Sequence, residues 1–303
     1  MKDHPLAKWN LKHDLQVPCA MIPSLTGIHF LITYGCSAEC DHCFIWGTPR
    51  RSAAMTVEQV DSFLDQAKAV GTVTGVCAEG GEAFTRYDLV VHFLRAATAH
   101  GLTGSALTNA SWVESRAQAR EKIAELMAAG LTNLGISTDQ WHQRSVPVER
   151  VDTLLQVCAE AGLAASRMET TLEGVMFRGR AAERLAGQMP TRPADELTKC
   201  PHEKLDAPSR IHLDCYGMLH LCQGLSLGRA PITEAIACYD ARSHPIVRHI
   251  LEGGPYALAQ FAATFGFEPA PGYVDACHLC YRAREFLRPH FPELLGPDEM
   301  YGA

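Results

Sequence analysis

The chain has 303 residues, a formal net charge of −7 and 20% charged residues, so it lacks the basic surface of a nucleic-acid-binding protein. No apolar run approaches the roughly 20 residues of a membrane-spanning helix, and residues 1–5 lack the basic and apolar regions of a signal peptide. We therefore expect a cytoplasmic protein without membrane contact. Twelve cysteines in such a chain indicate metal or redox chemistry rather than a disulfide framework.

Residues 1–27 contain Pro5, Pro18 and Pro23 and are expected to form an irregular lead-in. From residue 28 onward, short apolar runs alternate with segments of helical periodicity. The expected strands are residues 28–33, 72–77, 104–108, 131–137 and 163–170. The expected helices are residues 57–70, 87–100, 116–129 and 148–161, with Thr56 as the N-cap of the first and Gly71 as its stop.

This alternation predicts an α/β fold whose strands are parallel and joined by right-handed crossovers. A complete eight-fold barrel needs about 250 residues, and the alternation fades near residue 185. We therefore expect a partial (β/α)6 TIM-type barrel over residues 28–190. Helix and strand breakers crowd residues 187–193, which we interpret as a linker to a small α+β domain over residues 191–303.

Three cysteines, Cys36, Cys40 and Cys43, fall within eight residues directly after the first expected strand. Such crowding is typical of thiolates that converge on a metal ion or an iron–sulfur cluster. A zinc site that adds His42 as the fourth ligand is the alternative. A disulfide pairing does not account for the loop, because three cysteines cannot pair among themselves.

The C-x3-C-x2-C spacing of this loop resembles that of the radical S-adenosylmethionine (radical SAM) superfamily, with no insertion or deletion. The resemblance implies a [4Fe–4S] cluster on Cys36, Cys40 and Cys43, with one iron left free to bind S-adenosylmethionine. His42 stands where the family usually has an aromatic residue.

Further short motifs resemble the cofactor-binding segments of the same family. Gly80-Gly81-Glu82 resembles its Gly-Gly-Glu motif, although Glu79 replaces the frequent Thr and Ala83 the usual Pro. The resemblance implies that the cofactor is contacted by Gly80, Gly81, Glu82, Asn109, Ser137 and Arg167, the last through a bidentate fork. Caps and loop hydrogen bonds are the alternative for each. Asp139, Trp141, His142 and Gln143 either face substrate or form a solvated loop.

The last third of the chain carries a second set of cysteines. Residues 211–222 predict a β-hairpin with its turn at Tyr216-Gly217, and Gly217 precedes Cys222 with G-x4-C spacing. Cys277 and Cys280 form a C-x2-C pair at the start of a helix. These features resemble SPASM and twitch domains and imply one auxiliary [4Fe–4S] cluster on Cys200, Cys222, Cys277 and Cys280, since no cysteine follows Cys280. Structural zinc is the alternative.

Five cysteines remain: Cys19, Cys77, Cys158, Cys215 and Cys238. Cys77 and Cys158 fit small core residues. Cys215 is the candidate catalytic residue, because a thiol at the barrel mouth would donate a hydrogen atom to a substrate radical. A partly buried hairpin cysteine or a substitute cluster ligand is the competing interpretation.

The resemblance implies an enzyme that reductively cleaves S-adenosylmethionine to a 5′-deoxyadenosyl radical, which abstracts hydrogen from a substrate C–H bond. Crosslinking or epimerisation of a ribosomally made peptide is the first expectation, and dehydrogenation of a small alcohol or amino sugar is the second. A noncatalytic zinc or electron-transfer protein is the third. The enzyme would also need an external electron donor such as flavodoxin or ferredoxin.

Overall fold

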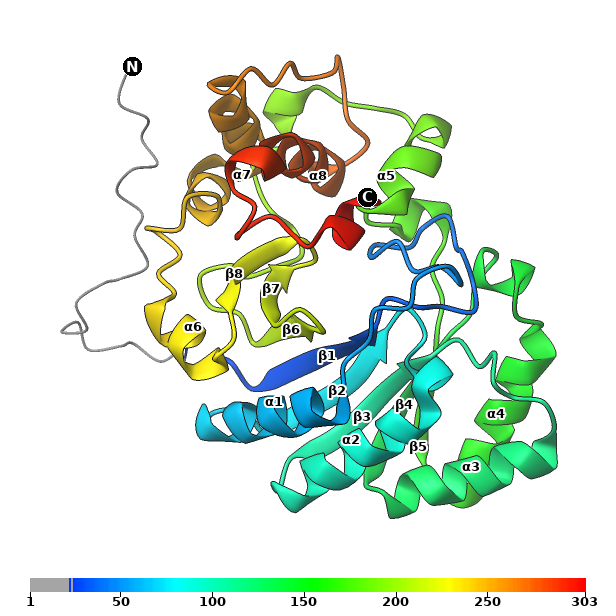
Figure 1. Ribbon diagram of the computed structural model, residues 1–303. Helices are drawn as coiled ribbons and strands as arrows, with labels where there is room; N and C mark the ends of the chain where they lie inside the picture. The colour runs from blue at the N-terminus through cyan, green and yellow to red at the C-terminus, as the bar shows by residue number, and fades with distance from the viewer. Residues whose placement is uncertain (1–21, 23) are drawn as a thin grey trace.

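The fold is organised around β1 (Gly27–Thr33), the central strand of an eight-stranded sheet (Figure 1). We describe residues 22 and 24–303 in a computed structural model, so most of the expected lead-in lies outside the described residues. The strand order is β5-β4-β3-β2-β1-β6-β7-β8. The other strands are β2 (Gly75–Gly80), β3 (Thr103–Thr108), β4 (Leu131–Ser137), β5 (Ala164–Met168), β6 (Arg210–Asp214), β7 (Met218–Cys222) and β8 (Leu225–Arg229).

Strands β1 to β6 pair in parallel, which confirms the predicted α/β fold with a partial barrel. The sixth parallel strand is β6, which pairs with β1 from Gly27↔Arg210 to Leu31↔Asp214. It comes from the segment expected to form the second domain, so the sheet continues across the boundary predicted at residue 190. The hairpin was predicted correctly, since β6 and β7 are antiparallel and Gly217 adopts a left-handed φ of 75° in the turn.

Four helices cover the outer face of the parallel strands: α1 (Val57–Ala69), α2 (Tyr87–Ala99), α3 (Arg116–Ala128) and α4 (Val148–Ala161) (Figure 1). Their bounds agree with the predicted ones to within one residue. Thr56 caps α1 in a capping box with Gln59, as its hydroxyl accepts a bond from the Gln59 amide. The buried side chains of α1, at spacings of three and four residues, face the sheet.

The second expected strand was placed too early, because β2 begins at Gly75 and extends to Gly80. Its pairing with β1 starts at Gly27↔Gly75, so the strand starts where it first meets β1. As a consequence, Glu79 and Gly80 belong to the strand and not to the following loop.

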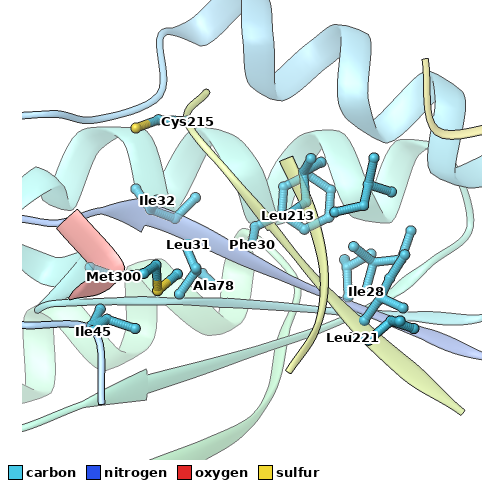
Figure 2. Packing of buried hydrophobic residues seen from close by; sticks show 14 of the residues in the cluster. Ile28, Phe30, Leu31, Ile32, Ile45, Ala78, Leu213, Cys215, Leu221 and Met300 are labelled. Carbon is cyan, nitrogen blue, oxygen red and sulfur yellow. The ribbon is translucent and has the colours of Figure 1, made fainter. Parts of the chain in front are cut away.

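The remaining helices are α5 (Arg180–Arg184), α6 (Ile232–Cys238), α7 (Val247–Ala263) and α8 (Ala276–Leu287). In the view of Figure 1, α7 and α8 pack together above β7 and β8, and α6 lies near β8. Figure 2 shows β1 crossing the main core, with Leu31 near Ala78 on one side and Ile32 on the other. A smaller apolar cluster, which includes Trp141 and Phe177, packs beside the cysteine loop. Among the described helices, none combines the length and the apolar character needed to cross a membrane.

Candidate active site and a second cysteine site

The cysteine loop leaves β1 at its carboxyl end and is fixed by backbone hydrogen bonds and by one buried arginine. The amide of Cys36 donates to the Thr48 carbonyl over 3.2 Å. Arg180 is 1% exposed and donates from Nη1 to the Cys40 carbonyl and from Nη2 to the Gly47 carbonyl, each over 2.8 Å. The guanidinium therefore joins the middle of the loop to the segment that follows Cys43.

The three thiols of the loop line one cavity of about 570 Å³ at the carboxyl ends of the strands. Burial, together with nearby Glu82 and Cys43, raises the pKa of Cys36 to about 12. Burial and the other two thiols likewise hold the pKa of Cys40 above its usual range. Three crowded thiolates repel each other, so a bound cation is what would stabilise them as anions.

The surroundings of these sulfurs fit an iron–sulfur cluster. The amide of Ala38 donates to Cys36 Sγ over 3.3 Å, and that of Gly47 donates to Cys43 Sγ over 3.2 Å. Hydrogen bonds to thiolate sulfur are among the features that tune iron–sulfur clusters. A Cβ at Gly47 would lie 3.2 Å from Cys36 Cβ and 3.7 Å from Cys43 Sγ, so glycine keeps this side of the site open.

The two glycines of the Gly-Gly-Glu segment bring β2 against the cysteine loop. A Cβ on Gly80, whose φ is 154°, would lie 2.4 Å from the Thr33 carbonyl oxygen, and one on Gly81 would lie 2.3 Å from that of Gly35. No side chain fits at such distances. We expected these glycines to admit a ligand, whereas the contacts described here are with the backbone of the loop itself.

Glu82 fixes the start of the loop that follows β3. Its Oε1 accepts from Thr108 Oγ1 over 2.8 Å and from the Phe84 amide over 3.1 Å, and its Oε2 accepts from the Asn109 amide over 2.6 Å. Burial raises the pKa of this carboxyl to about 7, although these donors act in the opposite direction. Glu82 is thus a buried acceptor that joins two walls of the cavity.

The other expected cofactor contacts also line the cavity, but their surroundings differ. Asn109 Nδ2 is directed at the cysteine loop, 3.2 Å from Ser37 Oγ and 3.8 Å from Cys36 Sγ. Ser137 lines the cavity at the end of β4. Arg167 lines it from the edge strand β5, where Asp152 and Glu169 already pair with its guanidinium.

In the segment after β4, Asp139, Trp141 and His142 form a largely buried cluster, whereas Gln143 is exposed. Asp139 Oδ1 accepts the amides of Trp141 and His142 over 3.0 and 3.1 Å. Its Oδ2 lies 3.0 Å from His142 Nδ1 and 3.3 Å from His42 Nε2. Burial raises the pKa of this carboxyl, but the two imidazoles outweigh that effect and hold it well below its usual range. His42 stacks on Trp141 with ring centroids 4.6 Å apart.

A second polar cluster inside the barrel was not predicted. Glu79, which lines the cavity, lies with Oε2 2.9 Å from His29 Nδ1 and with Oε1 2.6 Å from His212 Nδ1. Burial raises the Glu79 pKa, but His212 and His29 outweigh it and hold the carboxyl ionised. The three residues lie on β2, β1 and β6. Polar residues within strands otherwise rich in apolar side chains were the available signal.

The four cysteines expected to hold an auxiliary cluster, Cys200, Cys222, Cys277 and Cys280, line one small second cavity. Cys222 ends β7, and Cys277 and Cys280 lie in the first turns of α8, whose N-cap Asp275 accepts from the His278 amide over 2.6 Å. Burial raises the pKa of Cys277, and it raises that of Cys280 to about 11. Four converging thiols fit an iron–sulfur cluster, and the same donor set also suits zinc.

Two buried arginines complete this second site, and neither was predicted. Arg178 donates from Nη1 to Cys222 Sγ over 2.8 Å, and Arg284 Nη2 lies 4.0 Å from the same sulfur. Both side chains line the second cavity. Buried arginines follow no periodic pattern in the sequence, so no local pattern indicates that Arg178 and Arg284 belong to this site.

Cys215, the candidate hydrogen donor, is not brought to the active-site cavity. It is 7% exposed, belongs to the main hydrophobic core and lies on the Ile32 side of β1 (Figure 2). Its carbonyl accepts from Gln59 Nε2 of α1 over 2.9 Å, so the residue packs toward the outer helices. Cys215 lies in the turn directly after β6, where its side chain packs into the main core and does not line the active-site cavity, so we do not retain the catalytic role.

Comparison with known proteins agrees with this architecture. Residues 30–186 match the family model of the radical SAM superfamily. GTP 3′,8-cyclase of Synechococcus elongatus is 32% identical over 111 residues, which are 36% of this chain and 32% of the cyclase. The match thus spans about a third of that relative's length.

Two solved structures are also similar. BtrN in complex with AdoMet and 2-DOIA is 14% identical with a TM-score of 0.54, over 76% of this chain and 88% of BtrN. The enzyme anSMEcpe with bound AdoMet and the Cp18Cys peptide is 11% identical with a TM-score of 0.47, over 89% of this chain and 97% of that one. The BtrN likeness supports the assignment of the fold.

The family match covers more than half of the chain and includes the cysteine loop together with strands β2 to β5. The chain therefore belongs to the radical SAM superfamily, whose enzymes use a [4Fe–4S] cluster and S-adenosylmethionine.

Proposed function

We propose that the chain is a radical SAM enzyme that holds a [4Fe–4S] cluster on Cys36, Cys40 and Cys43 and oxidises a small substrate. The observation that carries the proposal is the convergence of these three thiols, Asn109 and Ser137 on the walls of a single cavity. When bound, the cluster and S-adenosylmethionine supply a 5′-deoxyadenosyl radical that abstracts hydrogen from an unactivated C–H bond.

The chain's own contribution is to bind and orient the cofactor and the substrate and to exclude water from the site. Asn109 Nδ2, within reach of Cys36 Sγ, would orient the cofactor end that approaches the cluster. Glu82 keeps the Thr108–Asn109 turn rigid and offers a carboxylate to the ammonium group of S-adenosylmethionine. Asp139 holds the imidazoles of His42 and His142, which also line the cavity.

The size of the cavity favours a small substrate over a peptide. A volume of about 570 Å³ lies within the range of about 300–1,000 Å³ found for pockets that enclose one small ligand. The nucleoside and amino acid of S-adenosylmethionine would fill much of it, which leaves room for a small alcohol or amino sugar. We therefore place dehydrogenation ahead of the peptide modification that we expected first.

An oxidation also needs an acceptor for the electron that the substrate radical loses after hydrogen abstraction. We propose that Cys200, Cys222, Cys277 and Cys280 hold a second [4Fe–4S] cluster that takes this electron. A cluster enclosed by four protein ligands has no open coordination position for a substrate, so electron transfer suits it better than binding. The first electron would come from an external donor of the flavodoxin or ferredoxin type.

The proposal is tested with anaerobically reconstituted protein, dithionite and S-adenosylmethionine. Formation of 5′-deoxyadenosine is expected, with deuterium transferred into it from a labelled substrate when panels of small alcohols, amino sugars and short peptides are supplied. If deuterium reached 5′-deoxyadenosine only from labelled peptides, peptide modification would replace dehydrogenation as the proposed function. Protein that holds iron and sulfide at both sites but forms no deoxyadenosine would exclude the enzyme and leave an electron-transfer protein.

A further inference from the structure

One short segment, residues 177–180, contacts both cysteine sites. The Phe177 amide donates to Asp275 Oδ2 over 3.2 Å, at the cap of the helix that carries Cys277 and Cys280. On the other side, the Arg180 amide donates to the Cys43 carbonyl over 2.9 Å. Gly179 makes this approach possible, because a Cβ there would lie 2.6 Å from Phe44 Cα.

Arg178, in the middle of this segment, lines both cavities and is 4% exposed. Its Nη1 lies 2.8 Å from Cys222 Sγ at the second site. Its guanidinium carbon also lies 5.4 Å from the ring centroid of Phe44, the residue after Cys43 at the first site. A single buried cation therefore stands between the two groups of thiols.

Arg178 and Arg284 lack a carboxylate partner among the described residues. Arg284 is 1% exposed and donates instead to the carbonyls of Gln223 and Cys280, over 3.0 and 3.4 Å. Glu203, which also lines the second cavity, pairs with Arg210, and Asp275 accepts two backbone amides. Burial of two cations without a negatively charged partner is strongly unfavourable.

The missing negative charge is supplied if the second site carries thiolates. Four thiolates bound to an iron–sulfur core or to zinc form a centre with net negative charge, whereas four neutral thiols would leave both arginines uncompensated. The arginines are thus matched to an anionic centre. Of the two, Arg178 makes the shorter contact with sulfur.

We propose that Arg178 is a positioning residue that raises the reduction potential of the second centre and so makes it an electron acceptor for the reaction in the neighbouring cavity. This inference rests on the proposed function. A reduced cluster carries one more negative charge than an oxidised one, so a nearby cation and an N–H···S bond stabilise the reduced form. The electron comes from the substrate radical, and the radical's proton leaves to solvent as the substrate is oxidised.

The test is a potentiometric titration of the full-length holoprotein followed by EPR. The signal that changes when S-adenosylmethionine is added belongs to the first cluster, and the unchanged signal belongs to the second. In Arg178→Met, reduction of the second cluster should become at least tenfold less favourable, a shift of 59 mV to lower potential for one electron. Arg178→Lys, which keeps the charge, should shift it less in the same direction.

Arg282→Met is the matched control, because Arg282 lies on the same helix as Cys280 but donates to the Ala182 carbonyl and does not line the second cavity. It should leave the potential unchanged. An unshifted potential in Arg178→Met would overturn the inference. So would loss of the cluster in Arg178→Met combined with an unshifted potential in Arg178→Lys, or zinc in place of iron at the second site.

These outcomes are separable from failure of the proposed function. Formation of 5′-deoxyadenosine by the unmodified protein depends on the first cluster and reports on that function alone. If deoxyadenosine forms while Arg178→Met leaves the second potential unshifted, only the role of Arg178 is lost.

Discussion

The two cysteine sites are built in opposite ways. The first takes its three thiols from one loop, fixes them with backbone amides, and faces a large cavity that also contains Glu82 and Asp139. The second gathers four thiols from three separate segments into a small cavity beside two arginines. An open site with nearby carboxylates suits a cationic ligand, and a closed site with nearby cations suits a fixed anionic centre. This contrast agrees with the roles that we propose, catalysis at the first site and electron transfer at the second.

The strongest test of this contrast is Cys40→Ala at the open site. Removal of one of only three ligands should abolish cluster binding there, so formation of 5′-deoxyadenosine should fall to background in the anaerobic assay. Cys238→Ala is the control, because Cys238 is exposed and lines neither cavity. Cleavage that persisted in Cys40→Ala would show that the loop is not the site of the reaction.

Cys277→Ala tests the closed site and should have a smaller effect. The iron content should fall by about half, because two [4Fe–4S] clusters hold equal amounts of iron. Deoxyadenosine should still form, since the first loop is intact, but it should no longer be coupled to substrate oxidation. Iron and sulfide analysis, combined with the deoxyadenosine assay, measures both effects. An unchanged iron content would show that Cys277 does not hold a second cluster.

Arg180→Met tests how rigidly the open site is held before any cofactor binds. The substitution leaves the Gly47 carbonyl without the Arg180 donor and leaves the Cys40 carbonyl with only the Cys43 amide, 3.1 Å away, so the metal-free protein should lose about 2–3 kcal/mol of unfolding free energy. Urea unfolding measures the loss. Arg184→Met, at a half-exposed position that pairs with Asp41 and Glu39, should cost less than about 1 kcal/mol. Equal losses would mean that Arg180 does not anchor the loop.

The pH dependence of the metal-free protein tests the buried carboxylate of the open site. The Glu82 pKa is raised from 4.5 to about 7 on folding, so the folded state holds a proton that the unfolded state has released between these values. The contribution of Glu82 to stability is therefore fully present below about pH 4.5 and falls by about 3 kcal/mol as pH rises through 7. In Glu82→Gln this contribution should vanish when urea unfolding at acidic and alkaline pH is compared. If the unfolding free energy of both proteins changed equally with pH, the proposed contribution of Glu82 would be contradicted.

Local sequence signals predicted most of the fold and the grouping of the cysteines at two sites. Helix α1 was predicted from Thr56 and the spacing of its apolar residues, and both sets of thiols from cysteine spacing, because these signals act over a few residues. The Glu79 cluster was missed because His29 and His212 meet it only through the strand order β2-β1-β6, which no local pattern encodes. Cys215 was expected at the barrel mouth but lies in the core for a related reason, since the direction of a turn side chain depends on the packing around it.

The place of β6 in the sheet makes the two halves of the chain depend on each other, which matters for engineering. This strand shields one side of β1, and the hairpin that follows it ends in Cys222. A chain cut after residue 190 would leave the central strand with a bare edge, prone to pairing with other chains. The two halves thus complete one sheet, and recombining either with a foreign partner would require replacing a strand as well as a linker.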